Sequence, residues 1–92
     1  MRTIWKYSIP LPQGRLVSIP RDATFLCAMR DPQGDFALWF EVDDEVEQSM
    51  HCFVCAGTGG TVPYGSYITS VVDGQFVWHI YEVPVTEMRE PL

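Results

Sequence analysis

The chain has 92 residues, which suits a single domain, and twelve acidic against six basic side chains give a net charge of −6. This charge argues against non-specific binding to DNA, RNA or an anionic membrane, which depends on many Lys and Arg side chains. One bound phosphate group stays compatible with it, because backbone amides and a single Arg can hold such a group. Three Trp, four Tyr and five Phe favour a small aromatic core, and self-association would bury more surface, so we expect a homo-oligomer.

Pro and Gly interrupt the chain at short intervals, and the stretches between them are rich in β-branched and aromatic residues. Such stretches favour strands and leave no window for a long helix. The expected strands are, in chain order, Thr3–Ile9, Arg15–Ile19, Thr24–Arg30, Phe36–Val42, Met50–Cys55, Ser66–Val72 and Gln75–Val83. Pro84 ends the last strand, so we expect a single β domain over residues 1–84 and a loose C-terminal tail over residues 85–92.

Two turn sequences predict hairpins. Asp31-Pro32-Gln33-Gly34 has Pro and Gly where a type I or II turn uses them, and Asp73-Gly74 is a strong two-residue hairpin signal. Asp43–Gln48 is acidic and is compatible with a loop or with one helical turn. The predicted fold is all-β: a small antiparallel sandwich or open barrel of six to seven short strands, with at most one short helical turn.

The segment Gly57-Thr58-Gly59-Gly60-Thr61 joins two of the expected strands and is the best candidate for a ligand contact. Its backbone amides are accessible to a phosphate or carboxylate, with the hydroxyl groups of Thr58 and Thr61 assisting. The alternative is a glycine-rich connection that needs positive φ angles. The segment is not a Walker loop, because no Lys and no helix follow it.

Two aromatic residues complete the predicted ligand-binding set. Trp39 alternates with Leu38 and Phe40, which look core-facing, so its ring is expected on a contact face or in a second packing layer. Tyr64 follows the glycine segment closely. Either ring would stack on a base, a contact worth about 1–3 kcal/mol. Positive charge for the ligand would come from arginine side chains, the candidates being Arg2, Arg15 and Arg30.

The acidic stretch supports an alternative function, in which the protein binds a basic groove of another protein. The carboxylates that would make this contact are Asp43, Asp44, Glu45 and Glu47. Weak cation binding and a simply solvated loop are the other interpretations, and the spacing does not fit an EF-hand.

No catalytic, metal or cofactor site is predicted. Cys52 and Cys55 form a Cys-x-x-Cys pattern, but residues three apart on a strand face opposite sides, even though His51 and Cys27 are further potential ligands. His79 shows no nucleophile or acidic orienter nearby in sequence, so we expect it to pair with a backbone group or a cross-strand neighbour. The chain is therefore expected not to be an enzyme.

The cysteine count and the N-terminal sequence favour a cytoplasmic protein. Three cysteines are an awkward number for a disulfide scaffold. Residues 1–6 lack the apolar core of a signal peptide, and no apolar run approaches the ~20 residues of a membrane helix. Reduced thiols and no membrane association are expected.

The chain resembles a group of small bacteriophage and prophage proteins of unknown function. The resemblance runs from Thr3 to Val83 and is carried by four segments: Thr3-Ile4-Trp5-Lys6-Tyr7 with Ile9-Pro10, Leu38-Trp39 with Glu41-Val42-Asp43, Gly57-Thr58-Gly59 with Pro63, and Phe76-Val77-Trp78-His79 with Tyr81-Glu82-Val83. Where the group often has Gly-Thr-Gly-His-Pro, this chain has Gly60-Thr61-Val62 before the proline. The loop therefore contains no ring nitrogen, which weakens any catalytic role for it.

The resemblance implies a phage origin and action in the host cytoplasm, where small accessory proteins often antagonise host immunity. Together with the glycine segment, it predicts a non-enzymatic protein that sequesters a small anionic, nucleotide-type signal. The alternatives are an acidic, protein-binding inhibitor of a host defence complex, similar to an anti-CRISPR protein, and a structural phage protein.

Overall fold

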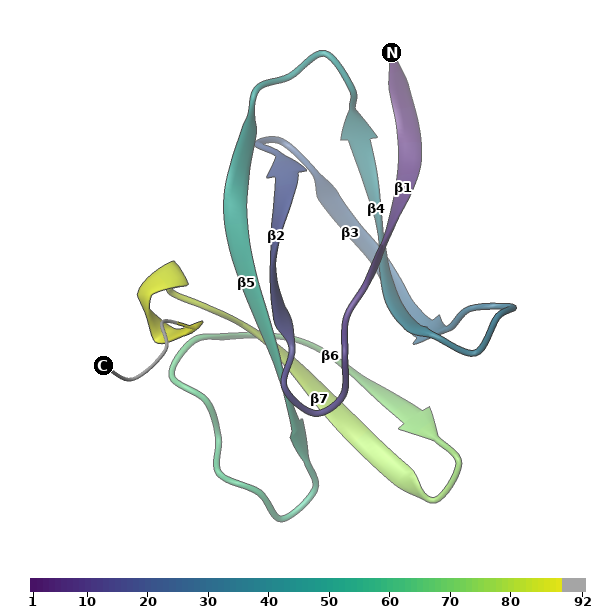
Figure 1. The fold of residues 1–92 in the computed structure, drawn as a ribbon, viewed down its shortest axis with the longest axis vertical. Coiled ribbons are helices and arrows are strands. Elements are labelled where there is room, and N and C mark those ends of the chain that lie inside the picture. The colour runs from purple at the N-terminus through teal and green to yellow at the C-terminus, as the bar shows by residue number, and fades with distance from the viewer. Residues whose placement is uncertain (89–92) are drawn as a thin grey trace.

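The computed structural model describes residues 1–88 and consists of seven antiparallel strands with one short 3-10 turn (Figure 1). The strands are β1 (Arg2–Ser8), β2 (Arg15–Pro20), β3 (Thr24–Arg30), β4 (Phe36–Asp43), β5 (Gln48–Gly57), β6 (Ser66–Asp73) and β7 (Phe76–Val83). The predicted all-β fold and its seven short strands are confirmed. Among the described residues, no helix is long and apolar enough to cross a membrane.

The strands form two open sheets that do not close into a barrel. The first has the order β1-β4-β3 and the second the order β2-β5-β7-β6, with every neighbouring pair antiparallel. The chain changes sheet after β1, after β2 and after β4, so each sheet is built from separated parts of the sequence (Figure 1). Of the two architectures that the sequence allowed, the two-sheet arrangement is the one found.

The core lies between the sheets and is built by alternation along the strands. On β4, the side chains that face inward are Phe36, Leu38, Phe40 and Val42, all at most 6% exposed. The second sheet contributes Ile19, Phe53 and Ile80, each at most 1% exposed. Complete burial of one such side chain contributes about 1.5–3 kcal/mol. The inward alternation predicted for Leu38 and Phe40 is confirmed.

Asp31 organises the predicted β3–β4 hairpin. Its side chain accepts hydrogen bonds from the backbone N–H groups of Gln33 and Asp35, both at 2.9 Å, and from Nζ of Lys6 at 2.7 Å. The Lys6 ammonium is the main reason why the pKa of this carboxyl group lies below its ordinary value, although desolvation opposes the shift. A buried carboxylate thus closes the turn and ties it to β1.

The β6–β7 hairpin forms as expected, but its turn lies one residue later. Asp73 pairs with Phe76, so the two loop residues are Gly74, with φ of 61°, and Gln75. The strand prediction that began at Gln75 is therefore wrong by one residue at this end. Gly74 has a positive φ and Gln75 does not, which is the pattern of a type II′ turn with glycine at the first loop position.

The acidic segment after β4 is a loop and not a helical turn. The N–H of Val46 donates to the carbonyl of Asp43 at 3.1 Å, which closes a single turn before β5. The 3-10 turn, η1, lies instead at Val85–Met88. It occupies the first half of the segment expected as a loose tail, and the rest of that segment lies outside the described residues.

Gly14 and Gly34 provide a matched test of this packing. Both have positive φ, 76° and 92°, but a Cβ at Gly14 would overlap the carbonyl oxygen of Phe53, while one at Gly34 would meet nothing within 4 Å. Backbone strain alone should make Gly34→Ala cost about 1–2 kcal/mol. Overlap adds to strain in Gly14→Ala, which should cost at least about 3 kcal/mol of unfolding free energy. Urea denaturation measures both, and equal losses would contradict the close approach of β5 to this loop.

Candidate functional site

The glycine segment starts as a tight turn at the end of β5. The N–H of Gly60 donates to the carbonyl of Gly57 at 2.9 Å, and Gly59 has φ of 91°. A positive φ at the third residue of such a turn is typical of type II, which selects glycine there. The interpretation of this segment as a glycine-rich connection that needs positive φ is therefore confirmed at Gly59. Anion binding by the backbone amides stays a prediction.

His79 connects this turn to the outer face of the second sheet. Its neighbours Trp78 and Ile80 pack on the core, so the imidazole lies on the opposite face of β7. Nε2 is 2.9 Å from the hydroxyl of Thr58, and Nδ1 is 2.7 Å from the hydroxyl of Ser70. Ser70 is the cross-strand neighbour of His79. The expectation that His79 pairs with a cross-strand neighbour is confirmed.

A further hydroxyl group extends this chain of hydrogen bonds. The hydroxyl oxygens of Tyr67 and Ser70 are 2.6 Å apart, so Tyr67, Ser70, His79 and Thr58 form one continuous network. Sequence reasoning missed Ser70 and Tyr67. The signal that would have found Ser70 is the hairpin register, because a turn at Gly74 and Gln75 places position 70 opposite position 79.

The turn and the outer face of β7 enclose a shallow groove of about 250 Å³. Its lining residues are Ala56, Gly57, Thr58, Gly59, Gly60, Val62, His79 and Tyr81. The polar part of the groove is made by His79 and Thr58, and the apolar part by Ala56, Val62 and the ring of Tyr81. Such a surface suits a small molecule with one hydrogen-bonding or anionic group and one flat apolar part.

The arginines that were expected to supply charge are engaged elsewhere. Nε of Arg2 is 2.7 Å from Glu41, and a guanidinium nitrogen of Arg15 donates to the carbonyl of Ser8 at 2.8 Å. Arg30 forms a two-bonded pair with Asp73, at 3.0 and 2.8 Å. His79 is therefore the ionisable group that can become cationic in the groove, considering the residues that line it.

The predicted stacking aromatics do not join the groove. Trp39 lies on the outer face of the first sheet, where its register partners are Lys6 and Cys27. Tyr64 is 79% exposed and lines a separate, shallow depression with Pro63 and Pro84. The structure thus divides the predicted ligand-binding set: Gly57, Thr58, Gly59 and Gly60 share one groove, while Trp39 and Tyr64 lie outside it and Thr61 is not among its lining residues.

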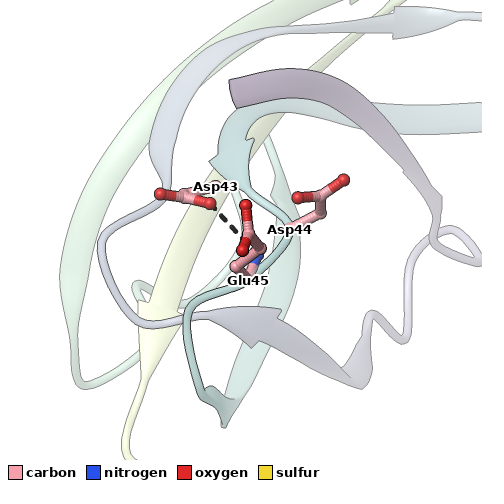
Figure 2. Close-up of side chains that lie close together, drawn as sticks. All are labelled: Asp43, Asp44 and Glu45. Atoms are coloured by element: carbon pink, nitrogen blue, oxygen red, sulfur yellow. Dashed lines mark hydrogen bonds between the residues drawn. The ribbon is translucent and has the colours of Figure 1, made fainter. Parts of the chain in front are cut away.

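The four acidic side chains of the alternative function fall into two groups. Asp43, Asp44 and Glu45 lie together at the end of β4, and their carboxylate oxygens come within 4.8 Å of one another (Figure 2). Glu47 lies apart and pairs with Arg21 at 3.3 Å. The dashed line in Figure 2 is the bond from the Glu45 backbone N–H to Asp43, at 3.1 Å, which holds the turn.

The N-terminal ammonium group of Met1 occupies the centre of this acidic group. It lies 3.3 Å from Asp43, 3.1 Å from Asp44 and 2.8 Å from Glu45. Hydrogen bonds, first to Glu45 and then to Asp44, raise the pKa of the amine to about 10. Three carboxylates at this spacing are a donor set that could hold a cation, and here the protein's own ammonium takes that position.

The cysteines do not converge. Cys55 belongs to the core cluster, whereas Cys52 is buried outside that cluster, as expected for positions three apart on β5. Cys27, Cys52 and Cys55 form no disulfide. Burial raises the pKa of the Cys55 thiol to about 11, so at neutral pH it is almost entirely protonated.

Thiol alkylation tests this burial. Iodoacetamide reacts with thiolates, so at pH 8 Cys27, which is partly exposed, should be modified at least about tenfold faster than Cys55. Peptide mass spectrometry over time measures the order, and the difference should vanish in denaturant. Faster modification of Cys55 in the folded protein would contradict its place in the core.

Comparison with known proteins places the chain in a family. The chain belongs to the family of the domain of unknown function DUF7352, whose model matches residues 1–90. No curated protein and no solved structure matches the chain significantly. The resemblance to a group of proteins of unknown function agrees with this membership as far as the unknown function is concerned.

Proposed function

We propose that this DUF7352 protein is a non-enzymatic binding module that takes up a small anionic, nucleotide-type ligand in the groove beside the glycine turn. The observation that supports the proposal is the meeting of His79 and Thr58 with the turn Gly57–Gly60 in one groove. Two features that are 21 residues apart in sequence thereby contribute to the same surface.

The polar end of the groove suits an anion. A protonated His79 donates from both ring nitrogens, and the hydroxyl groups of Thr58 and Ser70 can accept these bonds. The hydroxyl proton of Thr58 is then free to point toward a phosphate oxygen in the groove, while the Ser70 hydroxyl stays in contact with Tyr67. A Cβ at Gly59 would meet nothing within 4 Å, so the backbone there is open to a ligand from outside.

The apolar end suits a base. Val62 is 68% exposed and lies with Ala56 and Tyr81 along the groove. A flat heterocycle placed there would cover apolar surface and contact the ring of Tyr81, while its phosphate group reaches His79. Stacking on an aromatic side chain contributes about 1–3 kcal/mol per base.

Binding without turnover is supported by the surroundings of His79. Its hydrogen-bond partners in the described structure are hydroxyl groups, and none is a carboxylate that would orient the ring as a general base. In the setting that the phage resemblance implies, the protein would hold a host-defence signal in the cytoplasm and keep it from its receptor. A homo-oligomer could add an arginine from a second copy.

Calorimetry with a panel of cyclic nucleotides tests this proposal. At least one member should give saturable heat. His79→Gln and Thr58→Val should each weaken binding about tenfold, because a hydrogen bond to a charged group contributes about 1.5–3 kcal/mol. His51→Gln is the matched control, since His51 does not line the groove. Absence of heat from every member, or unchanged affinity in both groove variants, would sink the proposal.

The acidic alternative has one observation in its favour. Asp43, Asp44 and Glu45 already hold an ammonium group, which is the group that a lysine of a basic partner would present. In this second candidate function, the partner's lysine replaces Met1 in the cluster and the protein blocks a basic groove.

Binding to an oligolysine peptide distinguishes a specific cluster from general acidity. Neutralising the cluster, with Asp43→Asn, Asp44→Asn and Glu45→Gln, should weaken binding more than an equal change elsewhere, with Asp22→Asn, Asp35→Asn and Glu41→Gln. Acetylation of the Met1 amine should strengthen binding, because it removes the competing cation, and added salt should weaken it. Equal effects of the two triple variants would count against the cluster.

A further inference from the structure

A second histidine network lies on the inner face of the second sheet. Ser49 and His51 are two residues apart on β5 and share a face, and the Ser49 hydroxyl is 3.0 Å from Nε2 of His51. Nδ1 of His51 is 2.7 Å from Oε2 of Glu82 on β7. The His51 ring also lies parallel to the Phe53 ring, at 6.3 Å between centroids. These three contacts hold the imidazole in place, and one of them also holds Glu82, which lines a cavity between the sheets.

This network borders a cavity of about 140 Å³ whose walls come from both sheets. Its lining includes Ala23, Phe25, Phe40, Phe53, His51 and Glu82. Three phenyl rings and several aliphatic side chains make most of the wall, and His51 and Glu82 form a polar end. Arg21 is held at the cavity by its ion pair with Glu47. None of these groups is needed for the function proposed at the glycine turn.

We propose that this cavity is a binding site for a single-ring aromatic molecule that carries a hydrogen-bond donor, such as a phenol. An apolar cavity of about 150 Å³ lined by aliphatic and aromatic side chains is large enough to hold benzene. The Phe25 and Phe40 rings, 5.6 Å apart and nearly perpendicular, already show the edge-to-face geometry that aromatic rings favour. The ring of a ligand in the cavity would pack against these two rings in the same geometry.

Glu82 selects the head group. Within the described structure, only Oε2 of its carboxylate is engaged, by His51, and Oε1 is available to a ligand donor. Both ring nitrogens of His51 already have partners, so the Glu82 carboxylate is the group that would accept a hydrogen bond from the ligand. A ligand hydroxyl would form a charge-assisted bond with it, whereas a ligand carboxylate would be repelled.

The site is built for binding rather than for hydrolysis. Ser49, His51 and Glu82 stand in the order of a hydroxyl–imidazole–carboxylate relay, yet Ser49 is not among the residues that line the cavity. A molecule in the cavity would meet Glu82 and the edge of His51, and not the hydroxyl that could act as a nucleophile. The relay therefore serves to orient the carboxylate.

Fluorine NMR with 4-fluorophenol tests the proposal on the intact chain. The fluorine resonance should shift saturably with added protein, fluorobenzene should bind at least about threefold more weakly, and 4-fluorobenzoate should not compete. Ala23→Leu places a larger side chain in the cavity and should abolish the shift. Ala56→Leu is the matched control, because it fills the groove at the glycine turn and should leave phenol binding unchanged.

Glu82→Gln provides a variant that keeps the side-chain shape. Replacing the carboxylate with an amide should weaken 4-fluorophenol binding about three- to tenfold and leave fluorobenzene binding unchanged, since a neutral acceptor forms a weaker bond. A linear, non-saturating shift, equal binding by wild type and a folded Ala23→Leu variant, or equal affinity for phenol and benzoate would overturn the proposal. If Ala23→Leu does not fold, the test is whether Glu82→Gln weakens the binding of 4-fluorophenol and leaves the binding of fluorobenzene unchanged; equal effects on both would overturn the proposal.

Discussion

The structure depends on the packing of one ring, Phe40, at the centre of the space between the sheets. It contacts Tyr7 at 5.8 Å, Phe25 at 5.6 Å and Phe53 at 5.8 Å between ring centroids. These rings come from β1, β3 and β5, so one side chain links both strands beside it to the opposite sheet. With two sheets held at a fixed separation, the alternation along each strand determines which side chains line the cavity and which face outward.

The elements were readable from sequence because their causes are local. Alternation along β4 identified Leu38 and Phe40 as core residues, and Asp31-Pro32-Gln33-Gly34 specified a hairpin. The order of strands within each sheet was not readable, because short turns also connect strands of different sheets, as they do between β2 and β3 and between β4 and β5. The β6–β7 hairpin was recognised, but its turn was predicted one residue too early. An error of one residue in the turn changes the cross-strand partner of His79 by two positions, so Ser70 was not identified.

The two histidines show why the candidate sites were only partly predictable. His79 was correctly expected to pair across strands, because the hairpin that carries it is local. His51 shares a face with Ser49 by strand periodicity, but its second partner, Glu82, is 31 residues away and depends on the pairing of β5 with β7. The glycine turn was found as a turn, and the groove beside it was not, because His79 and Tyr81 reach it only through the pairing of β5 with β7.

The two-bonded pair of Arg30 and Asp73 has a mechanical consequence. Arg30 ends β3 in the first sheet, and Asp73 ends β6 at the tip of the β6–β7 hairpin, so the pair fastens the free end of that hairpin to the other layer. Trp78 also donates to Asp73, at 3.2 Å. Because Ser70 and His79 lie on this hairpin, the pair also limits how far the surface that carries them can move away from the first sheet.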